Sequence, residues 1–365
     1  MGGKKCERNF EANKNVAPIP CLTSHGVCGR MGGMEITMQA SEYEKNLYGQ
    51  DIAVIQRTDD CTVYRAETAN GRGVMTSYGV FPGVDLIYND FQTFSYHQDI
   101  HIQEEIMEIN HCRKGRFECE FQRGTYGYLD EGDLAVNMCH NRVTASSFPL
   151  EHYHGVAVII SLDKASAFLS SVFEDISIDL YSLRDRLCPN NRCFIMRAKA
   201  EIRHIFAELY TIPREVQKGY FKLKVLELLL FLSITELSEQ KETRQYFPKK
   251  QVEIVKQIKK YMTDNLEKRF SMEELSEKFH MGLTSMKLCF KGVYGTPIFT
   301  YIKVHRIQAA ASMLRHSNDN IATIAGKVGY ENASKFAAAF KDILGVSPIE
   351  YRKNPAQEYQ GQHRP

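Results

Sequence analysis

The 365-residue sequence lacks the features that mark membrane and exported proteins. Its longest strongly apolar stretch runs from Val225 to Ile234 and is interrupted by Glu227, whereas a bilayer-spanning helix needs about 20 apolar residues. No apolar run follows the lysines near the N-terminus, so a secretory signal is not expected. We therefore expect a cytoplasmic protein that does not span a membrane.

The motifs of catalytic and metal sites are also missing. The ten cysteines are scattered and none forms a Cys-x-x-Cys pair, so the sequence predicts reduced, mostly buried thiols and no metal or cofactor. There is no Gly-x-Ser-x-Gly, no glycine-rich phosphate loop and no His-Glu-x-x-His. His111 and Cys112 are neighbours, and on a strand they point to opposite faces. An enzyme is therefore not expected.

The whole chain has almost no net charge, but two parts of it carry net charges of opposite sign. The total is +2. Residues 251–353 carry 16 lysines and arginines against 10 aspartates and glutamates, or +6, and the remainder carries 30 against 34, or −4. A basic segment attached to a slightly acidic body is the electrostatic pattern of a DNA-binding protein.

The length predicts more than one domain, since a domain usually has about 100–200 residues. Because strand-like segments are followed by helix-like segments, we expect a multidomain α+β protein. Short strands with frequent turns in the first half favour a sandwich or barrel. The expected segments are a disordered leader at 1–34, a β-rich domain at 36–162, a helical subdomain at 163–237, a polar linker at 238–250, an all-helical domain at 251–353 and a tail at 354–365.

One expected helix, from Tyr220 to Leu237, is apolar nearly all round. Such a helix is buried either in its own domain or against a partner chain, and the pattern leaves both open. We expect this helix to form the dimer contact or to dock the linker. Its main apolar face comprises Leu223, Leu226, Leu230 and Ile234.

The C-terminal segment contains an internal repeat. Phe290-Lys291-Gly-Val-Tyr-Gly295 returns 50 residues later as Phe340-Lys341-Asp-Ile-Leu-Gly345, and in both copies a tyrosine follows the glycine after five residues. Each copy predicts a short helix, a tight turn and a second helix, the order of a helix-turn-helix, whose second helix enters the major groove. The residues expected to form the cores of the two units are Leu275, Phe279, Phe290, Ile324, Val328, Phe336 and Phe340.

These residues resemble the AraC/XylS family of bacterial transcription regulators. The resemblance covers about 100 residues and includes the linking-helix pattern Arg306-Ile307-x-x-Ala310-x-x-Met313-Leu314 and the run Gly345-Val346-Ser347-Pro348-x-x-Tyr351-Arg352. It implies two helix-turn-helix units joined by a long helix, binding to promoter DNA, contact with RNA polymerase and a homodimer. It also implies an N-terminal cupin-like β-barrel that senses a signal.

Helical spacing separates the outward positions of each recognition helix from its core positions. Met286, Cys289 and Phe290 should face the core of the first unit. The expected DNA-facing residues are Thr284, Ser285, Lys287, Leu288 and Lys291 in the first helix and Asn332, Ser334, Lys335, Ala338 and Lys341 in the second.

Two of these positions depart from the family pattern. The family often has Arg where this sequence has Leu288 and Ala338, and neither side chain can hydrogen-bond to guanine. We therefore expect the first helix to supply most of the direct base readout. The second should contribute mainly phosphate contacts through Lys335 and Lys341, and its Asn332 could read adenine.

The sequence leaves several alternatives for the signal that the N-terminal domain senses. The run from Glu105 to Leu129, with Asn110-His111-Cys112, resembles the siderophore-responsive branch of the family, so the alternatives are a siderophore or metal, another small molecule, or no effector. His152 and His154 would share one strand face, but no carboxylate follows as in cupin metal enzymes. Other histidines and cysteines near these two in the sequence are His97, His101, His111, His140, Cys112 and Cys139.

A further alternative for the function is a protein-binding adapter whose double repeat no longer binds DNA.

Overall fold

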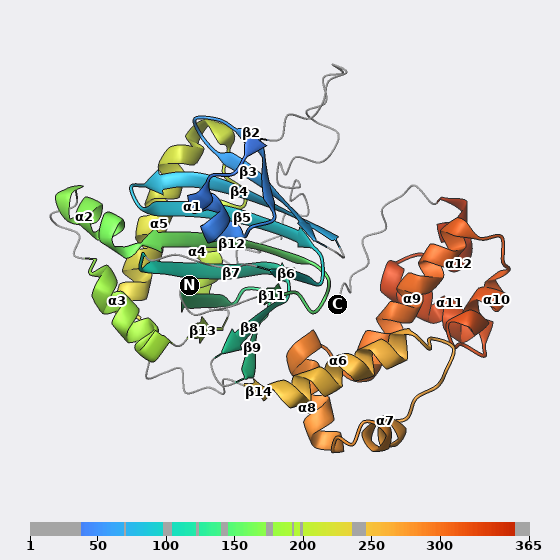
Figure 1. Cartoon of the computed structure of the whole chain (residues 1–365). Coiled ribbons are helices and arrows are strands. Elements are labelled where there is room, and N and C mark those ends of the chain that lie inside the picture. The colour runs from blue at the N-terminus through green and yellow to red at the C-terminus, as the bar shows by residue number, and fades with distance from the viewer. Residues whose placement is uncertain are drawn as a thin grey trace, which may run out of the picture.

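The computed structural model comprises a β-rich N-terminal region with helices and a C-terminal region made of helices (Figure 1). It describes residues 38–68, 71–97, 104–121, 124–139, 145–172, 178–191, 193–197, 200–235 and 246–354. The predicted leader, most of the predicted linker, the tail beyond Asn354, His101, His140 and the side chain of His97 lie outside the described residues.

The strands form two antiparallel sheets. The larger has the order β1 (Met38–Gln39), β2 (Ile52–Arg57), β3 (Thr62–Thr68), β4 (Gly71–Phe81), β5 (Val84–Gln92), β12 (Tyr153–Ser161), β7 (Ile106–Gly115), β10 (Leu134–Met138) and β13 (Phe194–Met196). The smaller has the order β14 (Phe247–Pro248), β9 (Thr125–Leu129), β8 (Phe117–Phe121), β11 (Ala145–Ser147) and β6 (Ser95–His97).

Strand β12 shows why the large sheet lies in the middle of this region. Val156, Val158 and Ile160 pack into one core, and the alternate residues Ala157 and Ile159 pack into another. Because successive side chains of a strand point to opposite faces, a strand that is apolar at every position is covered on both sides.

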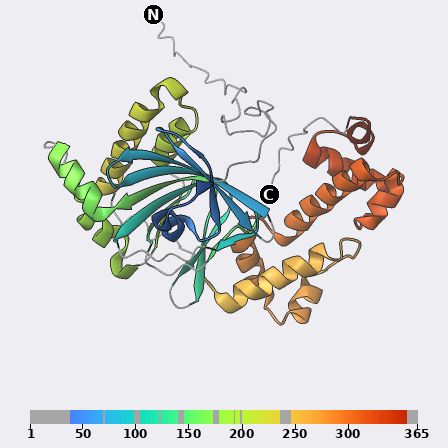
Figure 2. The ribbon, with the colours of Figure 1, turned by 45° about the horizontal axis from the view of Figure 1, so that its top comes forward.

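Helices cover one face of the large sheet, and Figure 2 shows them on the side of the strands away from the C-terminal region. They are α2 (Leu162–Val172), α3 (Leu180–Leu187), α4 (Ala200–Leu209) and α5 (Gln217–Ile234), with the short helices η1 (Pro189–Asn191) and η2 (Arg214–Val216) between them. The other face contacts the smaller sheet and α1 (Glu42–Tyr48).

The first half of the chain is rich in strands, as expected, and it also contains elements that the sequence did not predict. Helix α1 and the strands β2 and β3, which follow the edge strand β1, were not predicted. Strand β2 ends in exposed polar residues and lacks a clear apolar alternation. The prediction of a β-rich region followed by helices is confirmed, and the structure adds that the sheets are antiparallel.

Helix α5 buries the side opposite to the predicted one. Leu228, Leu229 and Leu232 are buried in the N-terminal region, whereas Leu223 is 63% exposed and Ile234 is 78% exposed. Of the four residues that the sequence placed on the main apolar face, only Leu226 is buried. The helix is therefore held by its own domain, and an apolar stripe remains on its outer surface. The stripe consists of Leu223, Leu230 and Ile234 on α5 together with Val216, which directly precedes the helix.

The C-terminal region contains all the helices that the sequence predicts. They are α6 (Lys249–Thr263), α7 (Met272–Lys278), α8 (Leu283–Tyr294), α9 (Ile298–His316), α10 (Ile321–Lys327), α11 (Ala333–Leu344) and α12 (Pro348–Lys353). Helix α6 begins at Lys249, inside the predicted linker, because Phe247 and Pro248 pair with β9 directly before it. Within the described ranges, the helices are all too short or too polar to span a bilayer.

Candidate nucleic-acid interface

The first helix-turn-helix consists of α7 and α8. Ser271 caps α7: its hydroxyl accepts from the Glu274 N–H at 3.0 Å, and its own N–H donates to the Glu274 carboxylate at 2.8 Å. These two reciprocal bonds form a capping box at the start of α7. In α8, Met286, Cys289 and Phe290 are fully buried against α6, as their spacing indicated.

The second unit consists of α10 and α11, and its geometry repeats that of the first. Phe290 meets Tyr301 edge-on with ring centres 5.6 Å apart and planes at 77°, and Phe340 meets Tyr351 at 5.4 Å and 77°. The sequence repeat is therefore a repeat of packing, and the two recognition helices occupy equivalent places in their units.

The C-termini of the two recognition helices are also alike. Gly295 and Gly345 end α8 and α11 in the left-handed conformation, with φ of 75° and 79°. Each glycine N–H donates at 2.8 Å to a lysine carbonyl oxygen, that of Lys291 or Lys341. Glycine adopts this conformation at little cost, so both helices stop at the same point of the motif.

The turns of the two units differ. Gly329 takes the left-handed position in the second turn with φ of 79°, and His280 takes the corresponding position in the first with φ of 50°. A side chain in this conformation costs roughly 1–2 kcal/mol. The second turn also has one more residue than the first, so Leu275 and Ile324 lie 49 residues apart whereas Phe290 and Phe340 lie 50 apart.

All the predicted DNA-facing residues of α8 are exposed. Thr284 and Ser285 lie in the first turn, and Lys287, Leu288 and Lys291 follow along the outer side. Leu288 is 48% exposed. The exposed face of α8 therefore combines hydroxyls, two cations and one apolar side chain.

In α11 the exposed set includes Ser334, Lys335, Ala338 and Lys341. Asn332 differs from the expectation, because it precedes the helix as its N-cap. Its amide oxygen accepts from the N–H groups of Ser334 and Lys335 at 2.8 and 3.0 Å. This oxygen is already engaged, so Asn332 is poorly placed for the bidentate contact with adenine that the sequence suggested.

The residues predicted for the two cores are buried, with one exception. Phe279 is only half-buried and packs at the edge of the first core, with its ring centre 5.7 Å from that of Tyr261. The buried ones are Leu275, Phe290, Ile324, Val328, Phe336 and Phe340.

The first unit is attached to the N-terminal region through the hairpin β8–β9. The buried Glu118 carboxylate accepts from the Tyr128 hydroxyl at 2.7 Å and from the Lys256 ammonium of α6 at 2.8 Å. Tyr128 and Phe247 belong to the same apolar core as α6 and α8. The core of the first unit is therefore shared between the two regions.

Arg116 adds a second connection. Its guanidinium donates to the carbonyl oxygen of Gly292 in α8 and pairs with Asp130. Burial, followed by repulsion from Arg197, lowers the pKa of Arg116 to about 10, so it is protonated at neutral pH. A Cβ on Gly292 would lie 2.1 Å from the Phe247 ring, so glycine is required for this close approach. The end of α8 that enters this contact is the end away from its exposed N-terminal face.

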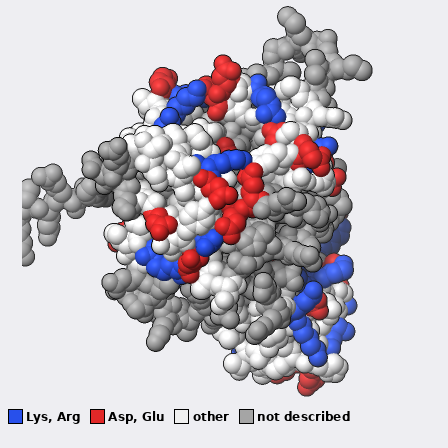
Figure 3. All heavy atoms as spheres, turned by 60° about the vertical axis from the view of Figure 1, so that its left-hand side comes forward, with Lys and Arg blue, Asp and Glu red and all other residues white. Residues whose placement is uncertain are grey.

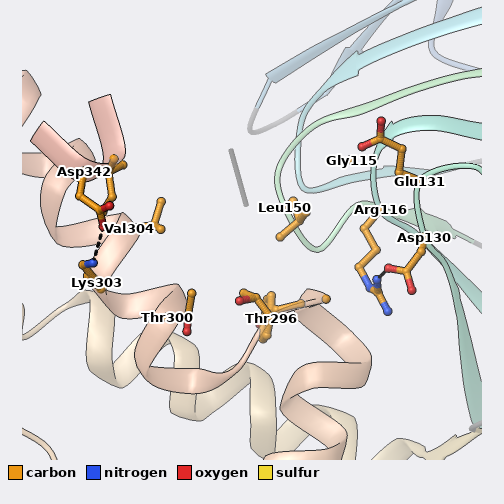
Figure 4. A pocket seen from close by; sticks show the side chains of 13 residues that line it. Gly115, Arg116, Asp130, Glu131, Leu150, Thr296, Thr300, Lys303, Val304 and Asp342 are labelled. Carbon is orange, nitrogen blue, oxygen red and sulfur yellow. Dashed lines mark hydrogen bonds and ion pairs between the residues drawn. The ribbon is translucent and has the colours of Figure 1, made fainter. Parts of the chain in front are cut away.

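A hollow of about 420 Å³ lies beside this contact, between the hairpin and helices α8, α9 and α11 (Figure 4). Its cations are already paired: Arg116 points toward Asp130, and Lys303 donates to the Asp342 carboxylate at 2.8 Å. Neither Arg116 nor Lys303 is therefore left unpaired to bind a charged ligand in the hollow.

No sequence pattern indicated that Glu118 and Lys256, which lie 138 residues apart, would form an ion pair. No periodicity connects two such positions. Arg116 lies in the run from Glu105 to Leu129 that resembles the siderophore-responsive branch, but the sequence assigned no role to it. Seen from the side of the N-terminal helices, acidic and basic side chains are mixed among the coloured atoms (Figure 3). A charge count of this region could not have indicated the contact.

The described histidines of the N-terminal region do not form a metal site. His111 stacks on Phe206 at 4.0 Å, and burial lowers its pKa to about 4. His152 lies just before β12 and contacts the Leu150 carbonyl oxygen, while His154 lies 4.0 Å from Asp90. Among the described residues, no three histidines, cysteines or carboxylates are placed to hold a metal ion.

Comparisons with known proteins match the C-terminal region. The model of a helix-turn-helix domain family matches residues 275–354. The HTH-type transcriptional activator AarP of Providencia stuartii is 34% identical over 104 residues, which make up 28% of this chain and 76% of that protein. The F1 operon positive regulatory protein of Yersinia pestis is 33% identical over 108 residues, which make up 29% of this chain and 36% of that protein.

Among solved structures, the C-terminal domain of AraT, a response regulator from Geobacillus stearothermophilus, is 26% identical. It covers 30% of this chain and 93% of that one, with a TM-score of 0.28. Because this score is low, the family assignment rests on the sequence matches. The chain spans only about a third of the length of the Yersinia relative but most of the Providencia one. This chain belongs to the AraC/XylS family of helix-turn-helix transcriptional regulators, which are not enzymes.

Proposed function

We propose that this protein binds promoter DNA in the cytoplasm through both recognition helices and regulates transcription in response to a signal received by its N-terminal region. The observation that carries the proposal is the repeated geometry: α8 and α11 end in the same caps and expose one lysine at the matching place, Lys291 in α8 and Lys341 in α11. Two helices so placed can enter successive segments of the major groove about 34 Å apart.

The test is DNA binding by the full chain, measured by fluorescence anisotropy on the DNA upstream of its own gene. A DNA-binding protein that neutralises several phosphates loses affinity steeply as salt is raised. We expect such a salt dependence here. Binding that is absent, or insensitive to salt, would instead favour the adapter function.

The two helices should have different roles. Helix α8 exposes Thr284, Ser285, Lys287 and Leu288 in its first half, so it should make most of the base contacts. Helix α11 exposes mainly alanines and lysines, so Lys335 and Lys341 should hold phosphates.

A base-substitution scan of the operator with Lys287→Ala and Lys335→Ala variants tests this division. Lys287→Ala should relax the preference at one base, and Lys335→Ala should weaken all operators by a similar factor. The reverse result would exchange the roles of the two helices.

The apolar stripe on α5 supports a homodimer. Val216, Leu223 and Leu230 recur every seven residues, and Ile234 continues the stripe. A second copy could cover the same stripe by a two-fold axis, which is the commonest symmetry of soluble oligomers. Leu223→Glu should yield monomers by light scattering while keeping the fold. The control is Leu226→Glu, which should unfold the protein because Leu226 is buried.

The N-terminal region supports a sensor role. Its two sheets enclose an apolar core, and we propose that they form the cupin-like barrel of the family, with residues 36–162 as the sensor and 163–237 as the dimerisation subdomain. A small-molecule effector would act by binding one arrangement of the DNA-binding region better than another. RNA polymerase is the expected protein partner at the promoter.

A further inference from the structure

A small hollow lies inside the N-terminal region, between the two sheets and beneath α1. Its volume is about 60 Å³. Since one water needs roughly 10–15 Å³ by this measure, the hollow has room for about four to six heavy atoms. The residues that matter for its chemistry are Phe91, Tyr96, Phe117, Phe148, Tyr153, Glu108 and Asn110.

Aromatic rings form one wall of the hollow. Phe148 stacks on Phe91 with ring centres 5.0 Å apart and on Tyr153 at 5.2 Å, and it meets Phe117 edge-on at 5.8 Å. The Tyr153 hydroxyl donates to the Asn110 amide oxygen at 2.5 Å, and the Tyr96 hydroxyl donates to a backbone carbonyl oxygen. With these hydroxyls engaged, the wall offers ring surfaces to whatever occupies the hollow.

Glu108 supplies the charge. It lies on β7 opposite Ile159 of β12, two residues from Asn110, so both polar side chains share the inner face of the strand. Among the described residues, none makes a hydrogen bond or ion pair with the Glu108 carboxylate, and no lysine, arginine or histidine lines the hollow. Burial raises the pKa of Glu108 to about 7.

The other titratable groups near this carboxylate cannot neutralise it. The Cys119 and Cys139 thiols and the Tyr153 phenol feel its charge, and Tyr48 and Tyr96 also line the wall. All are neutral or negative. Glu108 is partly buried. A carboxylate enclosed in this way without a partner is costly, and it is relieved by a ligand that brings positive charge and hydrogen-bond donors. Ring faces attract the same kind of ligand.

We propose that this hollow is the effector site of the sensor and that its ligand is a small protonated amine, held by the Glu108 carboxylate and the surrounding aromatic rings. The proposal rests on the proposed function and names the chemical class of its effector. Size and charge together select primary amines with a short carbon chain.

The test is a thermal-shift titration of the full chain with n-propylamine, with 1-propanol as the neutral ligand of the same shape. We expect the amine to raise the Tm and the alcohol to leave it unchanged. The variant Glu108→Gln should weaken amine binding about tenfold or more, because it removes the charge but keeps the size. The control Glu67→Gln removes an exposed carboxylate and should keep the full shift.

The pH dependence has a defined sign. A carboxyl group whose folded pKa is raised from 4.5 to about 7 stabilises the fold below the lower value and loses that contribution as the pH rises through 7. Without ligand, Glu108→Gln should therefore have an equal or higher Tm than the parent at about pH 8. Since the amine binds the ionised carboxylate, its shift should be larger at about pH 8 than at about pH 6.

Three results would overturn the proposal. Equal shifts with amine and alcohol would assign the hollow to neutral ligands, and no shift with either would leave it to water. A lower Tm of ligand-free Glu108→Gln would give this carboxylate a structural role. Loss of DNA binding by the parent chain would contradict the proposed function, whereas DNA binding without an amine response would contradict the effector class alone.

Discussion

The two helix-turn-helix units have nearly the same internal packing but different surroundings. The first shares its core with Tyr128 and Phe247, and its recognition helix receives a hydrogen bond from Arg116. The second has a core of its own, built from α9 to α12. One unit is therefore part of a larger cooperative structure, and the other depends on its own contacts.

The largest expected effect separates the two cores. Phe290→Ala and Phe340→Ala each delete a fully buried ring and should lower the free energy of unfolding by about 3–5 kcal/mol. By hydrogen exchange, Phe340→Ala should release amides only in the second unit. Phe290→Ala should also release amides in β8 and β9. Identical exchange patterns in the two variants would show that the units are equally independent.

The second effect concerns the turn of the second unit. A Cβ on Gly329 would lie 2.5 Å from the Leu266 carbonyl oxygen, and φ is positive, so Gly329→Ala should cost roughly 2–3 kcal/mol in urea denaturation. Gly326→Ala is the matched control, because its Cβ meets nothing within 4 Å and the residue is helical. The control should gain up to about 1 kcal/mol. A loss of similar size in both variants would remove the role of the turn.

The third effect tests the attachment of the first unit. Lys256→Met leaves the buried Glu118 carboxylate with only the Tyr128 hydroxyl, and we expect a loss of about 1–2 kcal/mol with faster proteolysis between the two regions. Lys260→Met removes an exposed lysine of the same helix, paired only with Asp264, and should change neither quantity. Equal behaviour of the two variants would mean that the ion pair does not hold the regions together.

The smallest effect is a gain. His280→Gly relieves the left-handed conformation in the first turn and should raise the free energy of unfolding by roughly 1 kcal/mol. DNA affinity should stay unchanged, because His280 lies before α8. A loss of stability would show that the imidazole makes a contact that outweighs the strain.

Features that depend on residues close together in the sequence could be predicted, whereas features that depend on contacts between distant residues could not. The C-terminal helices depend on local signals, such as the Ser271 cap and the glycines after α8 and α11, so their presence and order were predicted. The position of Asn332 was missed by one residue, because the second turn is longer and a cap looks like the first helical residue in sequence.

The contacts of the N-terminal region could not be predicted in this way. Glu118 finds Lys256 only after the hairpin has folded against α6, and Glu108 faces a hollow made by strands from distant parts of the chain. The outer face of α5 was misjudged because a helix that is apolar all round gives no periodic sign of which side is buried.

The strand β14 has a mechanical consequence. Phe247 and Pro248 are the edge of the smaller sheet, and α6 starts at the next residue, with the Lys249 N–H donating to the Gly124 carbonyl oxygen at 2.8 Å. At this junction no residue separates the strand from the helix. A tilt of the sheet edge would turn the axis of α6 by a similar angle, so a signal would reach the DNA as a rotation of the first unit and not as a change in tether length.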